Sequence, residues 1–166
     1  DNDISLLRRC IEDRSPILLL GAGFSLGAKG RNGQKLMLGG ALAQRLYEEI
    51  IIPNKDLLTE EALDTASLAI KWGNLFAICN VIGENNLTTQ RDTLFQEWMS
   101  ECTYNDAPYF SNLIKVDWKY IFTLNIDDLV EHIFKNEGHP LLCWKLSSER
   151  YADDPDKTVL IKQMVE

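Results

Sequence analysis

The sequence predicts an α/β fold: a doubly wound, Rossmann-like sheet that is mostly parallel, with helices on both faces. Two segments, residues 16–25 and 120–128, carry this prediction, because each is an apolar run that ends in small or polar residues. Buried parallel strands place functional residues at the carboxyl edge of a sheet in this way. The two segments therefore predict strands whose ends contribute to one site.

The first part of the chain predicts a helix followed by a strand. Residues 4–11 place apolar side chains on one helical face. Residues 16–20 are short, apolar and bounded by proline and glycine, which favours a buried strand. Gly21 and Gly23 then predict a tight turn whose backbone N–H groups approach a phosphate closely. The dehydrogenase fingerprint needs a third glycine where this chain has Leu26, so a plain turn remains the alternative reading.

The chain between the two segments predicts helices, because apolar residues recur at helical intervals. The expected helices cover residues 39–52, 59–70, 91–99 and 106–114. Pro53 ends the first of them, and Thr59 suits the N-cap of the second. The apolar stripe of residues 91–99 is assigned to the core. Residues 75–82 fit either a strand or a helix, because the run is too short to decide.

Polar residues crowd the end of the second predicted strand. Residues 118–122 are rich in aromatic and branched side chains, and helical spacing resumes over residues 129–134. Either Asp127 or Asp128 suits the N-cap of that helix. Capping needs only one such residue and leaves Thr123 and Asn125 unexplained.

Two further strands are expected, over residues 141–144 and 158–162, with the polar segment 147–157 as a linker between them. The chain lacks an initiator methionine and ends just after an apolar strand. These features predict that residues 1–166 form a single domain that is a fragment of a longer protein.

Composition fits one globular domain, with 166 residues of which 45% are hydrophobic. The net charge of −8 disfavours a general surface for nucleic acid or anionic membranes, because phosphate contacts require clustered Lys and Arg. No apolar run approaches the length of a membrane span, and no signal peptide opens the chain. The 4 cysteines show no pairing pattern, which is typical of reduced thiols in a cytoplasmic protein.

Both motifs together resemble the sirtuin superfamily: Gly21-Ala22-Gly23-Phe24-Ser25 and Thr123-Leu124-Asn125-Ile126-Asp127 occur in that family's order. The resemblance implies that the first segment cradles the phosphates of NAD. It implies that Thr123, Asn125 and Asp127 line the nicotinamide ribose pocket. Asn125 would orient water or ribose hydroxyls, and Asp127 would engage the nicotinamide carboxamide. Residues 39–46 also resemble the helix that follows the phosphate loop in bacterial sirtuin-like proteins.

The chain departs from the deacetylating sirtuins in two respects. Its cysteines are too scattered for the two Cys-x-x-Cys pairs that hold structural zinc, so no metal is expected; they are Cys10, Cys79, Cys102 and Cys143. The residues after Ser25 also lack the deacetylase sequence, which disfavours an acyl-lysine substrate. The remaining resemblance is to zinc-free NAD hydrolases of bacterial anti-phage defence. It implies an attached sensor or partner domain and a homo-oligomer.

The histidine on which that family relies lies in a His-Gly pair after a downstream strand, and this chain has no such pair. His132 falls on an expected helix, and His139 falls in a turn before Pro140. The expected activity is hydrolysis of NAD to nicotinamide and ADP-ribose, with Asn125 and Asp127 as catalytic residues. These 166 residues alone are expected to hydrolyse NAD poorly or not at all, because the His-Gly pair that would supply the base is absent. The alternatives are a non-catalytic module that binds NAD or ADP-ribose, and a structural domain whose glycines only turn the chain.

Overall fold

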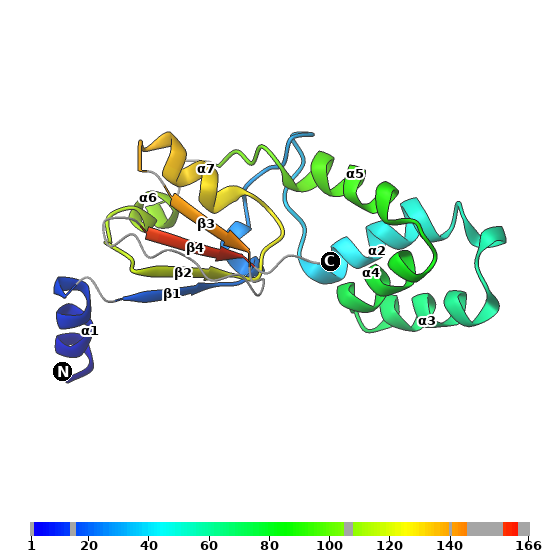
Figure 1. Cartoon of the computed structure of the whole chain (residues 1–166), viewed down its shortest axis with the longest axis horizontal. Coiled ribbons are helices and arrows are strands. Elements are labelled where there is room, and N and C mark those ends of the chain that lie inside the picture. The colour runs from blue at the N-terminus through cyan, green and yellow to red at the C-terminus, as the bar shows by residue number, and fades with distance from the viewer. Residues whose placement is uncertain (1, 14–15, 105–107, 140, 146–157, 163–166) are drawn as a thin grey trace.

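The computed structural model describes residues 2–13, 16–104, 108–139, 141–145 and 158–162. They form two lobes, one built on a sheet and the other purely helical (Figure 1). The strands of the sheet lobe are β1 (Ile17–Leu20), β2 (Tyr120–Thr123), β3 (Leu141–Lys145) and β4 (Thr158–Lys162). Its helices are α1 (Asn2–Glu12), η1 (Ala22–Ser25), α6 (Pro108–Leu113) and α7 (Leu129–Asn136).

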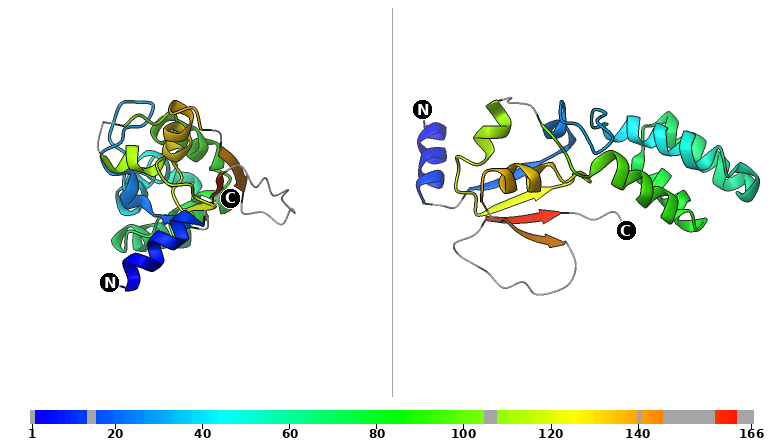
Figure 2. Two further views of the ribbon diagram at one scale, coloured as in Figure 1. Left: turned by 90° about the vertical axis from the view of Figure 1, so that its left-hand side faces the viewer. Right: turned by 90° about the horizontal axis from the view of Figure 1, so that it is seen from above.

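The sheet has the order β1-β2-β4-β3, and each neighbouring pair is parallel. Leu20, the last residue of β1, pairs with Thr123, the last residue of β2. The strands point toward the helical lobe, which lies beyond their carboxyl ends (Figures 1 and 2). The predicted α/β class, the four strands and the meeting of the two motifs at one sheet edge are therefore confirmed.

Helices cover one face of the sheet in the described part of the chain. Helices α6 and α7 lie over that face (Figure 1), where Leu20 and Ile121 are buried. On the opposite face Ile17 and Leu19 are 60% and 69% exposed. Helix α1 stands beyond the end of β1 instead of covering it (Figure 1). The helical layer expected on the second face is thus not found over β1, and the doubly wound arrangement stays a prediction.

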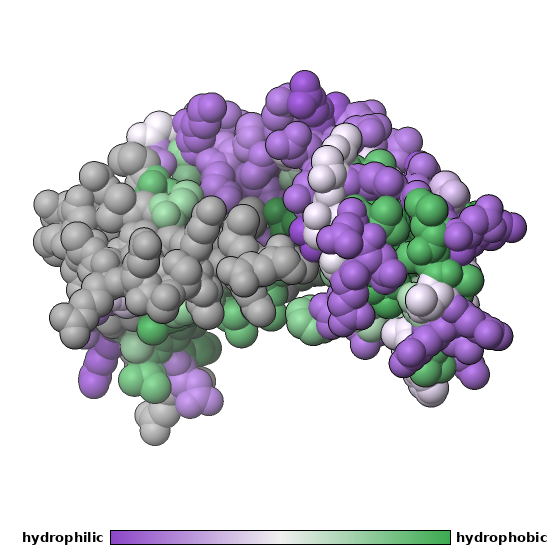
Figure 3. All heavy atoms as spheres, turned by 45° about the vertical axis from the view of Figure 1, so that its right-hand side comes forward, coloured by the Kyte–Doolittle hydropathy of each residue, from purple (hydrophilic) through white to green (hydrophobic). Residues whose placement is uncertain are grey.

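The helical lobe comprises α2 (Gly39–Leu46), η2 (Tyr47–Ile51), η3 (Lys55–Leu57), α3 (Glu60–Lys71), α4 (Leu75–Glu84) and α5 (Thr88–Met99). Thr59 caps α3 as predicted, since its hydroxyl accepts a hydrogen bond from the Ala62 N–H at 3.2 Å. Asn74 caps α4 in the same way through the Ala77 N–H, at 3.1 Å. This cap settles the ambiguous run at residues 75–82 as helix. Hydrophobic patches interrupt the hydrophilic surface of this lobe (Figure 3). Its exposed large apolar side chains include Ile52, Leu57, Leu68, Trp72 and Phe76.

Several predicted boundaries shift or cannot be placed. Helix α5 begins at Thr88, ahead of the expected start at residue 91. Helix α6 covers Pro108–Leu113, and the first two residues expected in it lie outside the described residues. The predicted linker at 147–157 and the segment 163–166 lie outside them too.

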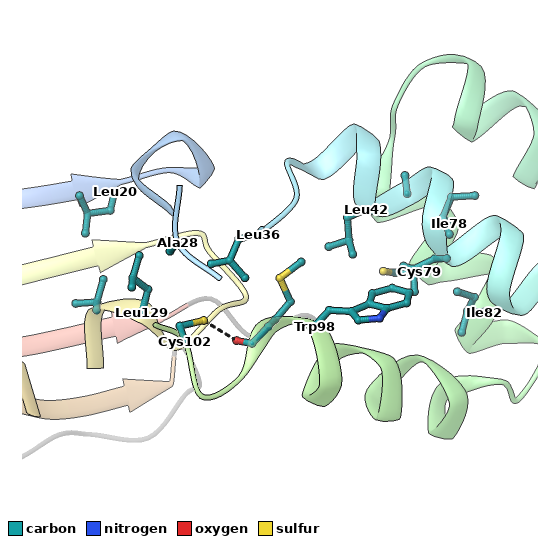
Figure 4. Packing of buried hydrophobic residues seen from close by; sticks show 14 of the residues in the cluster. Leu20, Ala28, Leu36, Leu42, Ile78, Cys79, Ile82, Trp98, Cys102 and Leu129 are labelled. Carbon is teal, nitrogen blue, oxygen red and sulfur yellow. Dashed lines mark hydrogen bonds between the residues drawn. The ribbon is translucent and has the colours of Figure 1, made fainter. Parts of the chain in front are cut away.

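Two chain segments, one containing Lys29 and the other Thr103, connect the lobes and are hydrogen-bonded to each other. Lys29 and Thr103 exchange two backbone hydrogen bonds of 2.8 Å. Beside them, Gly30 packs so tightly that a Cβ would lie 1.9 Å from the Trp98 carbonyl oxygen. One hydrophobic cluster runs through this junction, from Leu20 in the sheet lobe to Ile78 in the helical lobe (Figure 4). The junction is therefore a packed part of the core.

Candidate functional site

Three buried polar side chains join the two sequence motifs. The Ser25 hydroxyl donates to Asp127 Oδ2 at 2.8 Å, and Asn125 Nδ2 donates to Ser25 Oγ at 2.8 Å. All three residues are at most 7% exposed. Ser25 follows β1 and the other two follow β2, so the parallel pairing of these strands brings them together. The structure thus places Ser25, Asn125 and Asp127 in one cluster.

The backbone around the cluster is held by its own side chains. The Thr123 hydroxyl accepts a hydrogen bond from the Asn125 N–H at 3.1 Å, which shapes the turn after β2. Asp127 Oδ1 accepts one from the Leu129 N–H at 3.2 Å, at the start of α7. Asp128 occupies the N-cap position of α7 but makes no side-chain capping bond. Of the two candidate caps, Asp127 therefore bonds to the first turn. The Asp128 carboxylate instead lies 3.3 Å from His132 Nε2 and accepts hydrogen bonds from residues before β2.

Asn125 keeps one unpaired polar atom. The single proton of the Ser25 hydroxyl goes to the Asp127 carboxylate, so the Asn125 group that faces Ser25 must be the NH₂. Its Oδ1 is buried and has no hydrogen-bond partner within the described part of the chain. A buried acceptor without a partner is costly and calls for a donor from a ligand or a water molecule. Asn125 Oδ1 is therefore a buried acceptor that no described group satisfies.

The glycine-rich loop forms the predicted tight turn, in which the Phe24 N–H donates to the Gly21 carbonyl oxygen at 2.9 Å. Residues Ala22–Ser25 form the short 3₁₀ turn η1, and the next long helix begins only at Gly39. Neither Gly21 nor Gly23 has a positive φ, and a Cβ on either would meet nothing within 4 Å. The backbone of the turn therefore does not require glycine at either position. Both positions are exposed and leave open space beside the cluster, into which a ligand can approach the backbone.

Phe24 was expected to contact NAD, but its ring packs within the protein. It makes an edge-to-face contact with Phe110 on α6, with ring centroids 5.5 Å apart. Tyr109 lies next to both rings and donates its hydroxyl to the Leu26 carbonyl at 2.8 Å. Phe24 thus anchors the loop to α6, which is a structural role.

A pocket of about 70 Å³ opens between the lobes at the carboxyl edge of the sheet. Asn125 and Asp127 supply its polar side chains, and Ala22 brings the glycine-rich loop to its wall. The remaining lining residues come from both lobes and are apolar or glycine: Met37, Gly39, Leu42, Leu75, Met99, Leu124 and Ile126. Such a lining suits a flat apolar ring that carries a few polar substituents.

The pocket is smaller than the roughly 300–1,000 Å³ typical of ligand sites. A larger hollow of about 520 Å³ lies between α7 and β3, and Glu131, Lys135 and His139 contribute to its lining. It contains none of the predicted site residues, and neither His132 nor His139 lines the pocket at the sheet edge.

Burial raises the pKa of two cysteine thiols, Cys79 and Cys102. Burial raises the pKa of the Cys102 thiol, and the hydrogen bond and charge of Asp128 raise it further. Burial also raises the pKa of Cys79, which the positive charge of Arg91 partly opposes. Both side chains therefore stay protonated at neutral pH.

The described residues contain no group of three or more His, Cys, Asp or Glu side chains arranged to hold a metal ion. Among the helices that they form, none has the length and apolar character needed to cross a membrane.

Comparisons of the chain with models of protein families, with curated proteins and with solved structures find no match. The site is thus defined by its own residues. Sequence reasoning selected Ser25, Asn125 and Asp127, but it missed the apolar wall of the pocket, including Leu75 and Met99. No signal marked these wall residues, because apolar residues at helical spacing look like ordinary core.

Proposed function

We propose that this chain is a sirtuin-like domain that binds NAD across the carboxyl edge of its sheet. The observation that carries the proposal is the buried cluster of Ser25, Asn125 and Asp127, which unites both motifs and leaves Asn125 Oδ1 without a partner beside a pocket. In a parallel α/β sheet, ligands bind outside the carboxyl ends of adjacent strands. The resemblance to NAD hydrolases supplies the identity of the ligand.

The residues present fit such a ligand in two ways. The open space beside Gly21 and Gly23 lets phosphates reach backbone N–H groups, which hold anions even in a chain of net charge −8. Asn125 Oδ1 accepts a hydrogen bond, and both the ribose hydroxyls and the carboxamide of NAD are donors. The Ser25 side chain is buried and its hydroxyl donates to Asp127, so it is not free to donate to a phosphate.

The proposed reaction cleaves the bond between nicotinamide and ribose, with water as the acceptor, to give nicotinamide, ADP-ribose and a proton. Nicotinamide leaves as a neutral base, so the ribose passes through an oxocarbenium-like state that needs positioning and electrostatic support. Asn125 directs its Oδ1 toward the ribose or the attacking water. Asp127 holds Ser25 and Asn125 in place and supplies negative charge beside the developing cation. A role in anti-phage defence, in a homo-oligomer with an attached partner domain, rests on the resemblance alone.

A second candidate function is a regulatory module that binds NAD or ADP-ribose without cleaving it. It is favoured by one observation: neither of the chain's histidines lines the pocket, so no imidazole base faces the proposed ligand. The two functions share the same binding site and differ only in turnover.

Calorimetric titration with NAD and with ADP-ribose, combined with an assay of nicotinamide release, tests the proposal. Asn125→Ala should keep the affinity for NAD within about tenfold, roughly 1.4 kcal/mol, because its contacts matter mainly in the transition state. In a complete protein that releases nicotinamide, the same change should abolish release. Binding without release would select the regulatory module.

Gly23→Val should abolish NAD binding and leave the circular dichroism spectrum unchanged, because its side chain enters the space left for phosphate without meeting protein atoms. Gly83→Val is the matched control: a Cβ there also meets nothing within 4 Å, and Gly83 lies exposed on α4, outside the residues that line the pocket. Normal NAD binding by a folded Gly23→Val protein would refute the proposed site.

A further inference from the structure

Asp128 binds the segment that leads out of the helical lobe. Its Oδ2 accepts a hydrogen bond from the Glu101 N–H at 2.7 Å, and its Oδ1 accepts one from the Cys102 N–H at 2.9 Å. Its own N–H donates to the Met99 carbonyl oxygen at 3.2 Å. Asp128 therefore bonds to three backbone groups of residues 99–102, here called the connector, although 27 positions separate it from Glu101.

The connector needs such a clamp because part of it is strained. Glu101 has a φ of 50°, a left-handed conformation that a residue with a side chain adopts only when its surroundings impose it. Hydrogen bonds from backbone N–H groups to a carboxylate are stronger than those to a neutral acceptor. The two Asp128 oxygens therefore supply the interactions that hold Glu101 in this conformation.

Met99 links the hydrogen bonds of Asp128, here called the clamp, to the pocket. Met99 is the last residue of α5, lies next to the clamped segment and forms part of the pocket wall. On its other side, Asp128 directly follows Asp127, which supplies a polar group to the same pocket. Asp128 thus lies between two residues of the pocket lining, Asp127 on the sheet lobe and Met99 at the end of α5.

We infer that Asp128 is a positioning residue: its carboxylate fixes the connector after α5 and thereby places Met99 against the ligand. Asp128 does not line the pocket itself. The inference rests on the proposed function only for the identity of the ligand, because the clamp and the pocket wall are features of the protein alone.

The test compares Asp128→Asn and Asp128→Ala with Asp64→Asn, a control carboxyl exposed on α3. Selective methyl labelling gives one NMR signal for each of the 3 methionines. Amide hydrogen exchange reports the Glu101 and Cys102 N–H groups, and calorimetry gives the affinity for NAD.

We expect exchange at Glu101 and Cys102 to accelerate about tenfold in Asp128→Asn and further in Asp128→Ala, because the first variant keeps one acceptor oxygen. The Met99 methyl signal should move in both, and NAD should bind about tenfold more weakly. Asp64→Asn should change none of these quantities. A folded Asp128→Asn protein with unchanged exchange and an unchanged Met99 signal would overturn the inference. So would a displaced Met99 signal with unaltered NAD affinity.

Two outcomes are separated by the design. If the unaltered chain binds no NAD, the proposed function fails, and the Met99 signal and amide exchange alone decide whether Asp128 positions the wall. If the Asp128 variants do not fold, amide exchange in the unaltered chain decides instead. Rapid exchange at Glu101 and Cys102 there would contradict the clamp, and slow exchange would support it.

Discussion

The Ser25 hydroxyl donates a hydrogen bond to the Asp127 carboxylate across 102 positions of sequence. The bond lies at the carboxyl edge of the sheet, where β1 and β2 end side by side. Because the same hydroxyl accepts from Asn125, one oxygen atom joins all three polar residues. Removing it would leave a buried amide and a buried carboxylate each short of a partner.

Ser25→Ala should therefore destabilise the chain by about 2–4 kcal/mol, since the Asn125 amide loses its acceptor and the Asp127 carboxylate loses one of its donors, at about 1–3 kcal/mol for each lost buried hydrogen bond. Urea unfolding measures the change. Ser67→Ala, on the exposed side of α3, is the control and should stay within about 0.5 kcal/mol of the unaltered chain. Equal stabilities for the two variants would mean that the cluster is not formed.

Gly30→Ala should cost about 3 kcal/mol or more, because a Cβ would lie 1.9 Å from the Trp98 carbonyl oxygen and the backbone cannot yield cheaply. Gly33→Ala is the informative comparison. Its φ of 75° strains an alanine, but nothing lies within 4 Å of the new Cβ, so about 1–2 kcal/mol is expected. Thermal unfolding of both variants checks the order, and a reversed order would contradict the packing of the lobe junction.

Leu19→Thr and Leu20→Thr should differ sharply although the residues are neighbours. Leu19 is 69% exposed and Leu20 is 7% exposed, because they point to opposite faces of β1. The first change should alter stability by about 0.5 kcal/mol or less, and the second should cost roughly 2–4 kcal/mol. A large loss for Leu19→Thr in denaturant unfolding would show that this face is covered.

The free energy of unfolding should fall as the pH rises above about 8.5, where thiols of the unfolded chain ionise. Burial raises the pKa of both Cys79 and Cys102 in the fold, so the folded chain retains protons that the unfolded chain releases. Their contribution is complete below the unfolded pKa and is lost as the pH rises toward the folded pKa. Urea unfolding at pH 7 and pH 10 measures this, and replacing both residues with alanine should weaken the dependence.

Sequence patterns were sufficient for the strands and the polar cluster because these are local signals. An apolar run ending in glycine or in Asn125 and Asp127 marks a strand end whatever surrounds it. The Thr59 cap could also be predicted, because its hydrogen-bond partner, the Ala62 N–H, lies only three residues away.

The remaining features depend on residues distant in sequence. Asp128 looked like a capping residue, and nothing near it marks its bonds to Glu101 and Cys102, which precede it by 27 and 26 positions. Phe24 looked like part of a ligand loop, but its partner Phe110 lies on a helix far downstream. The exposure of Leu19 could not be predicted either. The run from Ile17 to Leu20 is apolar throughout, which predicts burial on both faces of the strand.

The parallel pairing of Ile17 with Tyr120 has a consequence for how the chain folds. When β1 leaves the ribosome, roughly a hundred residues must still be synthesised before its partner β2. Strand pairings between residues so far apart in sequence form slowly. Helices α2 to α5 follow one another in sequence and make mostly local contacts, so they are expected to assemble first. The helical lobe is then the early product of translation, and the ligand site, which needs both strands, is completed late.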